Sequence, residues 1–67
     1  MILGFIGTGK IASSVIIGIC ESKIKFNQII ISPRNKEIAN TLEKKFKKIT
    51  IAKNNQEVID KSNWIFL

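Results

Sequence analysis

The segment ILGFIGTGKIA at positions 2–12 decides how this chain folds. Its first part, positions 2–6, is a short apolar run, which is typical of a strand buried on both faces of a parallel sheet. Glycines at positions 7 and 9 end that strand. From Lys10 to about Ser22 the apolar residues recur at helical spacing. The segment therefore predicts a strand, a tight glycine turn and a helix, in that order.

The rest of the chain repeats this alternation. The sequence predicts further strands at 29–31, 49–51 and 64–67, a helix at 36–46, and a short helix opened by Asn54 and Asn55. The order is β-α-β-α-β-α-β with short connections, which requires right-handed crossovers and a parallel sheet. In a doubly wound arrangement the four strands lie in the order 3-2-1-4.

The first helix is apolar around most of its circumference, since Val15, Ile16 and Ile17 are consecutive. We therefore expect it to be buried on two sides, which a chain of 67 residues alone could hardly provide. Gly18 lies inside this helix, where it is less favourable than alanine. A close approach to a strand and simple tolerance explain Gly18 equally well.

Positions 7–12, GTGKIA, match the pattern G-x-G-x-x-A. Gly7 permits the tight turn, Gly9 leaves room for a pyrophosphate against the backbone, and Ala12 allows close packing of helix on strand. The amides at the start of the helix and its dipole then favour the diphosphate. Because the pattern follows a strand and opens a helix, it predicts a dinucleotide site in a Rossmann-like α/β domain that spans residues 1–67.

A second motif overlaps the first. Positions 4–10, GFIGTGK, match the G-x-x-x-x-G-K loop of nucleoside triphosphatases. That loop needs a serine or threonine next, because its hydroxyl binds Mg²⁺, and the chain has Ile11. Gly4 also falls inside the predicted strand, which leaves too few residues to wrap a triphosphate. We therefore reject a triphosphatase and expect Lys10 to be an exposed lysine near the cofactor phosphates.

The residues after the second strand indicate which cofactor binds. Enzymes selective for NAD commonly place a carboxylate there to bond the ribose hydroxyls, and this chain has SPRN at positions 32–35 instead. Ser32 offers a hydroxyl, Arg34 a planar cation suited to phosphate, and Asn35 an amide. An ordinary polar turn with Asn35 as helix cap explains Ser32 and Arg34 less well. The pattern predicts a preference for NADP(H) over NAD(H).

These motifs together resemble the pyrroline-5-carboxylate reductases. The resemblance rests on GFIGTGKIA at 4–12, Gly18 late in the first helix, SPRN at 32–35, and Asn55 with the following run into SNWIFL at 62–67. Members of that family reduce 1-pyrroline-5-carboxylate to L-proline with NAD(P)H, in the cytoplasm and as homo-oligomers. The resemblance covers all 67 residues but only the amino-terminal part of such an enzyme. The nicotinamide loop and the helical dimerisation domain, which holds the imino-acid site, would lie beyond Leu67.

The resemblance also implies a set of cofactor-binding residues. The pyrophosphate would lie along the turn, Ser32, Arg34 and Asn35 would hold the adenosine 2′-phosphate, and Asn55 would contact the adenosine part or cap its helix. The complete set is Ile6, Gly7, Thr8, Gly9, Lys10, Ile11, Ser32, Arg34, Asn35 and Asn55. No catalytic residue is assigned, and the 67 residues alone are expected to lack reductase activity.

Other reductases remain possible. That family usually has alanine at position 8, where this chain has Thr8. It has asparagine or glutamine in place of Lys10, and methionine or leucine in place of Ile11. The β-hydroxyacid dehydrogenases and the deazaflavin-dependent NADP reductases share much of the fingerprint. Membership in either would keep the cofactor prediction and change the predicted substrate. A nucleotide-binding module without catalysis is a further alternative.

Composition excludes several classes of protein. The chain has no histidine and one cysteine, so it lacks the parts of a Ser-His-Asp triad or a multi-cysteine zinc site. Its net charge of +6 comes from lysines spread along the chain and the single arginine Arg34. We interpret this as a solvated surface rather than a nucleic-acid site. No apolar run is long enough to span a membrane.

Overall fold

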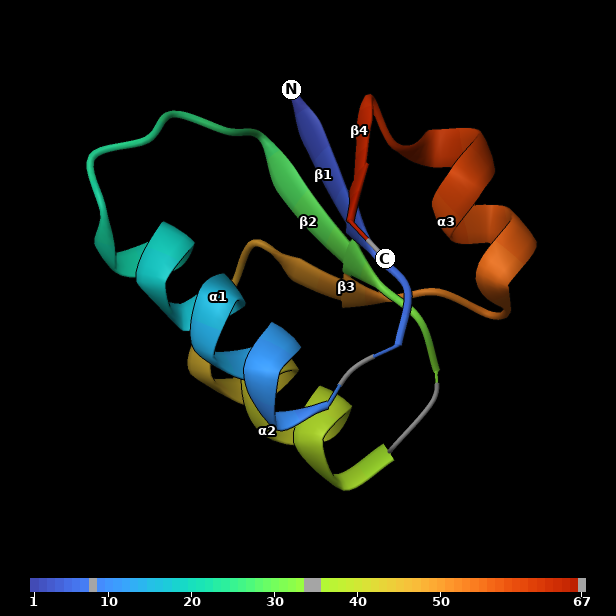
Figure 1. The fold of residues 1–67 in the computed structure, drawn as a ribbon, viewed down its shortest axis with the longest axis horizontal. Helices are drawn as coiled ribbons and strands as arrows, with labels where there is room; N and C mark the ends of the chain where they lie inside the picture. Colours follow the sequence, from blue (N-terminus) through green and yellow to red (C-terminus); the bar gives the residue numbers. More distant parts are fainter. Residues whose placement is uncertain (8, 34–35, 67) are drawn as a thin grey trace.

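A computed structural model describes residues 1–7, 9–33 and 36–66 of the chain. Its elements are β1 (Ile2–Phe5), α1 (Lys10–Glu21), β2 (Gln28–Ile31), α2 (Lys36–Lys45), β3 (Ile49–Ile51), α3 (Asn55–Lys61) and β4 (Trp64–Phe66). The strands form one parallel sheet in the order β3-β2-β1-β4 (Figure 1). The predicted Rossmann-like α/β fold and strand order are thereby confirmed. The proposed helix cap at Asn35 lies outside the described residues.

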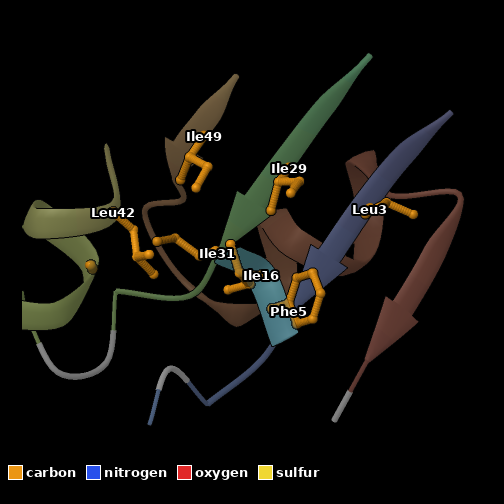
Figure 2. Close-up of a cluster of buried hydrophobic side chains, with 8 residues drawn as sticks. Leu3, Phe5, Ile16, Ile29, Ile31, Leu42 and Ile49 are labelled. Carbon is orange, nitrogen blue, oxygen red and sulfur yellow. The ribbon is translucent and has the colours of Figure 1, made fainter. Parts of the chain in front are cut away.

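The larger core lies between the sheet and the two helices α1 and α2 (Figure 2). Side chains at alternate positions of β1 and β2 point into it, as the period of two along a strand requires. Ile16 of α1 and Leu42 of α2 meet them from the helix side. The buried members are Leu3, Phe5, Ile16, Ile29, Ile31, Ala39, Leu42 and Ile49. Burial of this continuous apolar surface is the main favourable term in folding the domain.

A smaller core lies on the other face of the sheet, under α3. Ile30 of β2 points to this side, where it packs with Ala52 and Val58. Because β2 is buried on both faces, its apolar run has no polar alternation, as the sequence predicted. The two cores together fix α1 and α2 on one side and α3 on the other.

The first helix is covered on one side only within the described chain. Ile16 is buried on the sheet, whereas Val15 is 43% exposed and Ile11 is 83% exposed. The described chain thus covers α1 on one side, in line with the expectation that 67 residues could hardly cover both, and burial of the second side stays a prediction. Gly18 makes no close approach, because an added Cβ would meet nothing within 4 Å. Simple tolerance is the explanation that remains for this glycine.

Gly4 is the glycine that packing requires, although its place within a strand gave no sign of this. A Cβ at this position would overlap the Oγ of Ser62 and lie 2.8 Å from Cγ1 of Val58. Val58 is fully buried, so neither neighbour can move away without opening the smaller core. The absence of a side chain at Gly4 is what lets α3 lie directly against β1.

No helix of the described chain is long and apolar enough to cross a membrane.

We expect Gly4→Ala to lower the free energy of unfolding by about 1–3 kcal/mol, because overpacking forces its neighbours to shift. Gly18→Ala is the matched control. It adds the same methyl group at an open helical position, so it should raise stability by about 0.5–1 kcal/mol. Urea unfolding followed by circular dichroism measures both. Equal effects of the two substitutions would contradict the packing assigned to Gly4.

Candidate functional site

The carboxyl ends of the four strands lie at one edge of the sheet, and all three helices begin there (Figure 1). At this edge β1 is flanked by β2 on one side and by β4 on the other. The chain leaves β1 for α1 at the point where the strand order reverses. Ligands of open α/β sheets bind in the crevice at such a switch point, which places the candidate site at the turn after β1.

The turn has the geometry expected of its two glycines. Gly7 has a φ of 85°, in the left-handed region where an L side chain costs about 1–2 kcal/mol. The amide of Gly9 donates to the carbonyl oxygen of Gly7 at 3.1 Å. Gly9 is the N-cap residue of α1 and has extended dihedral angles. An added Cβ at either glycine would project into open space, so the backbone here is accessible to a ligand.

The start of α1 offers unpaired amides to an anion. No side chain caps this helix, and its first turn holds no acidic residue. The first helical bond runs from the amide of Ser13 to the carbonyl oxygen of Gly9 at 2.8 Å. The amides of Lys10, Ile11 and Ala12 precede it and have no acceptor within the helix. With the helix dipole and the exposed Lys10 beside them, these three donors form a site for a negatively charged group.

A groove of about 580 Å³ opens directly beside these amides. Its floor is aromatic, because the rings of Phe5 and Phe66 stack with centroids 4.7 Å apart at 10°. The exposed side chains of Ile11 and Val15 form the helix wall. The lining residues are Phe5, Ile6, Gly7, Gly9, Lys10, Ile11, Ala12, Val15 and Phe66. The groove thus joins polar backbone donors to an apolar trough, which suits a ligand with a charged diphosphate and flat rings.

Five of the predicted site residues line the groove: Ile6, Gly7, Gly9, Lys10 and Ile11. Thr8, Arg34 and Asn35 were also predicted, and they lie outside the described residues. Val15 and Phe66 were not predicted to line the site. Val15 follows Ile11 by one helical turn, so the same face of α1 carries both. The position of Phe66 depends on the register in which β4 pairs with β1, and the predicted strand order does not give that register.

Ser32 lies at the end of β2 and is fully buried. Its amide donates to the carbonyl oxygen of Phe5 at 2.9 Å. Its hydroxyl oxygen accepts a hydrogen bond from the amide of Gly7 at 3.0 Å. The side chain is therefore directed at the glycine turn, inside the protein.

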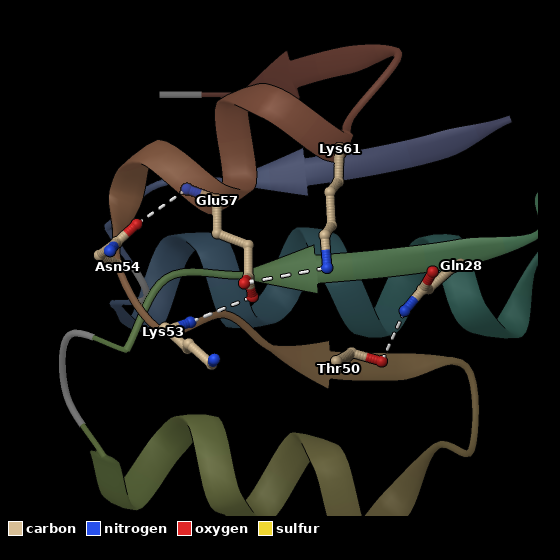
Figure 3. A network of polar contacts seen from close by, with 6 residues as sticks. All are labelled: Gln28, Thr50, Lys53, Asn54, Glu57 and Lys61. Atoms are coloured by element: carbon tan, nitrogen blue, oxygen red, sulfur yellow. Dashed lines mark hydrogen bonds and ion pairs between the residues drawn. The ribbon is translucent and has the colours of Figure 1, made fainter.

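Asn55 is the first residue of α3 and is exposed at the same edge of the sheet. The alternative that Asn55 caps this helix is wrong, because the cap is Asn54, whose Oδ1 accepts from the amide of Glu57 at 2.9 Å (Figure 3). Glu57 accepts in turn from the amide of Lys53 at 3.2 Å and pairs with Lys61 at 3.8 Å. These contacts fix the start of α3 without using Asn55.

Neither the free cysteine nor a metal cluster contributes to this site among the described residues. Burial is the main cause that raises the pKa of the Cys20 thiol, with Glu21 adding to it, while Lys48 lowers it. Cys20 lies at the far end of α1 from the glycine turn, so it is not part of the site. No group of three histidine, cysteine or acidic side chains that could hold a metal ion occurs in the described ranges. The site can bind and orient a ligand.

Residues 2–67 match a family described as NADP oxidoreductase, coenzyme F420-dependent. Neither the curated proteins nor the solved structures gave a match to this chain. The matched span includes the turn, the end of β2 and all three helices.

The two asparagines before Gln56 test which of them caps α3. Asn54→Ala removes the cap and should lower the free energy of unfolding by about 1 kcal/mol. Asn55→Ala, the matched control one residue on, should change stability far less. Thermal unfolding of both variants is the measurement. A larger loss for Asn55→Ala would contradict the cap assignment.

Proposed function

The chain belongs to the family of F420-dependent NADP oxidoreductases, and we propose that it is the NADP(H)-binding part of an enzyme that reduces 1-pyrroline-5-carboxylate to L-proline. Membership in this family implies that the chain is a nicotinamide-dependent oxidoreductase domain. The cofactor preference and the substrate are the proposal. We propose further that the full-length enzyme is a cytoplasmic homo-oligomer that binds neither nucleic acid nor membranes.

The observation that carries the cofactor proposal is the uncapped start of α1 beside an apolar groove. The amides of Lys10, Ile11 and Ala12 would bind the diphosphate, with the Lys10 side chain adding positive charge. Arg34 and Asn35, after the end of β2, would hold the 2′-phosphate, and Asn55 would contact the adenosine part. Bound NADPH would supply a hydride, and the chain's share is to bind and orient it.

The substrate proposal rests on sequence resemblance. GFIGTGKIA at 4–12 and SPRN at 32–35 resemble the pyrroline-5-carboxylate reductases, which share a domain of this family. Lys10 is the one charged residue in the described lining of the groove, and it is assigned to the diphosphate, which leaves no charged side chain there for the imino acid. Recognition of the substrate is therefore assigned to a part of the enzyme outside these 67 residues.

The description of the matched family favours a second candidate reaction, hydride transfer between NADP(H) and the deazaflavin coenzyme F420. The full-length gene product distinguishes the two. We expect it to oxidise NADPH when 1-pyrroline-5-carboxylate is added and to form L-proline, measured by absorbance and mass spectrometry. Turnover with F420 alone would replace the first proposal by the second. Binding of NADPH without either turnover would leave a cofactor-binding module.

Gly9→Val tests where the cofactor binds. The extended dihedral angles of Gly9 suit any residue, and an added Cβ meets no atom within 4 Å. We therefore expect only a modest loss of stability, since valine is a poorer N-cap residue than glycine, and a loss of NADPH affinity of about tenfold or more, because the branched side chain would occupy the space of the diphosphate. Calorimetric titration and thermal unfolding measure the two quantities. Unchanged NADPH affinity would contradict the proposed binding mode.

Arg34→Ala tests cofactor selectivity. A charge-assisted hydrogen bond to phosphate contributes about 1.5–3 kcal/mol, so NADPH affinity should fall roughly tenfold or more while NADH affinity stays nearly constant. Lys36→Ala is the control for a general loss of positive charge, and it should lower NADPH affinity much less. A ratio of NADPH to NADH affinity that Arg34→Ala leaves unchanged would refute the assignment.

A further inference from the structure

Ser32 is the one buried polar residue in the described part of the chain, with no exposed surface. Burial of a hydroxyl is unfavourable unless the group is hydrogen-bonded. It directly follows β2, in which Ile29 and Ile31 are fully buried. A small apolar residue would serve the core better at this position. The hydrogen bonds of the Ser32 hydroxyl must therefore account for a polar group at this buried position.

The hydroxyl joins the end of β2 to the first residue of the glycine turn. Its oxygen accepts from the amide of Gly7 at 3.0 Å. The register of the sheet prepares this contact, since Phe5 pairs with Ile31 and the amide of Ser32 donates to Phe5. Gly7 lies two residues beyond Phe5, where the main chain has turned away from β2. The Ser32 hydroxyl oxygen therefore accepts from the Gly7 amide in place of a backbone carbonyl.

Two hydrogen bonds hold the two peptide groups of Gly7. Its amide is held by Ser32, and its carbonyl oxygen accepts from the amide of Gly9. Glycine has the widest conformational freedom of any residue, so these two contacts are what select the φ of 85°. Gly9 is the N-cap of α1. The path from Ser32 through Gly7 to Gly9 therefore sets the direction in which the first amides of α1 point.

From this geometry we propose that Ser32 is a positioning residue for the diphosphate and not a contact to the 2′-phosphate. The inference rests on the proposed function, since it concerns how the dinucleotide is held. The diphosphate is common to NADPH and NADH, so Ser32 contributes equally to both affinities. Selectivity between the two cofactors is then left to Arg34 and Asn35.

The test compares three variants of the chain. Ser32→Ala removes the acceptor of the Gly7 amide. Ser32→Cys keeps a weak acceptor and covers the case in which the alanine variant fails to fold. Ser62→Ala is the matched control, because the Ser62 Oγ is also buried but has no hydrogen-bond partner in the described ranges. Dissociation constants for NADPH and for NADH are measured by calorimetry for each.

We expect Ser32→Ala to weaken both cofactors by about fivefold to tenfold, the usual effect of leaving a donor unpaired, with their ratio unchanged within about twofold. Ser32→Cys should lie between serine and alanine, and Ser62→Ala should resemble the unmodified chain. Without cofactor, the Gly7 amide proton should exchange faster and shift upfield in Ser32→Ala. The amide of Ile30, in the central strand β2, should keep its protection if the effect is local.

The outcomes separate the two proposals. A fall in NADPH affinity alone would show that Ser32 contacts the 2′-phosphate, which overturns the positioning role and leaves the proposed function intact. Loss of protection at Gly7 and Ile30 together would make the residue merely structural and also overturns the inference. If the unmodified chain binds neither dinucleotide, the proposed function fails, and the positioning role fails with it. Equal weakening of both cofactors with a local change at Gly7 supports it.

Discussion

The candidate site depends on one constraint, the pairing of β1 with β2 on one side and with β4 on the other. This pairing places the carboxyl ends of these strands at one edge of the sheet. A strand paired on both sides leaves no backbone group free along its length, so the chain can become accessible only where pairing ends. That point is Gly7, and the sharp turn it permits returns the chain over the sheet as α1. The same pairing brings Phe66 against Phe5. Both the polar end and the aromatic floor of the groove are thus consequences of one central strand.

Close packing on the far face keeps that strand in place. Gly4 lets α3 lie against β1, and Val58 fills the smaller core beneath it. Because α3 leads directly into β4, a shift of α3 away from the sheet would also move Phe66. The floor of the groove would then change. The cap at Asn54 and the contacts of Glu57 hold the start of this helix at the same edge. Stability on one face of the sheet is therefore coupled to the shape of the site on the other.

The order of elements could be predicted because it rests on local patterns. The apolar runs, the helical spacing and the glycines of the turn all lie within a few residues of one another. The burial of Ser32, the need for glycine at position 4 and the exposure of α1 depend on residues distant in the chain. The choice of Asn54 over Asn55 as cap is a shift of one residue, which local patterns do not resolve. Sequence reasoning found the turn and named Ser32, but it did not find the hydrogen bond that joins the Gly7 amide to the Ser32 hydroxyl.

The division of the site into backbone and side-chain parts explains its chemistry. Amides at the start of α1 recognise an anion by direction and dipole, and they carry no information about the rest of the ligand. Side chains at the end of β2 can discriminate, because a guanidinium matches a phosphate in charge and in geometry. The two parts would meet at Ser32, whose hydroxyl precedes the proposed selectivity residues in the sequence and contacts the glycine turn. If both proposals hold, a change of cofactor preference would proceed through the residues after Ser32, while the hydroxyl and the turn it supports stay fixed.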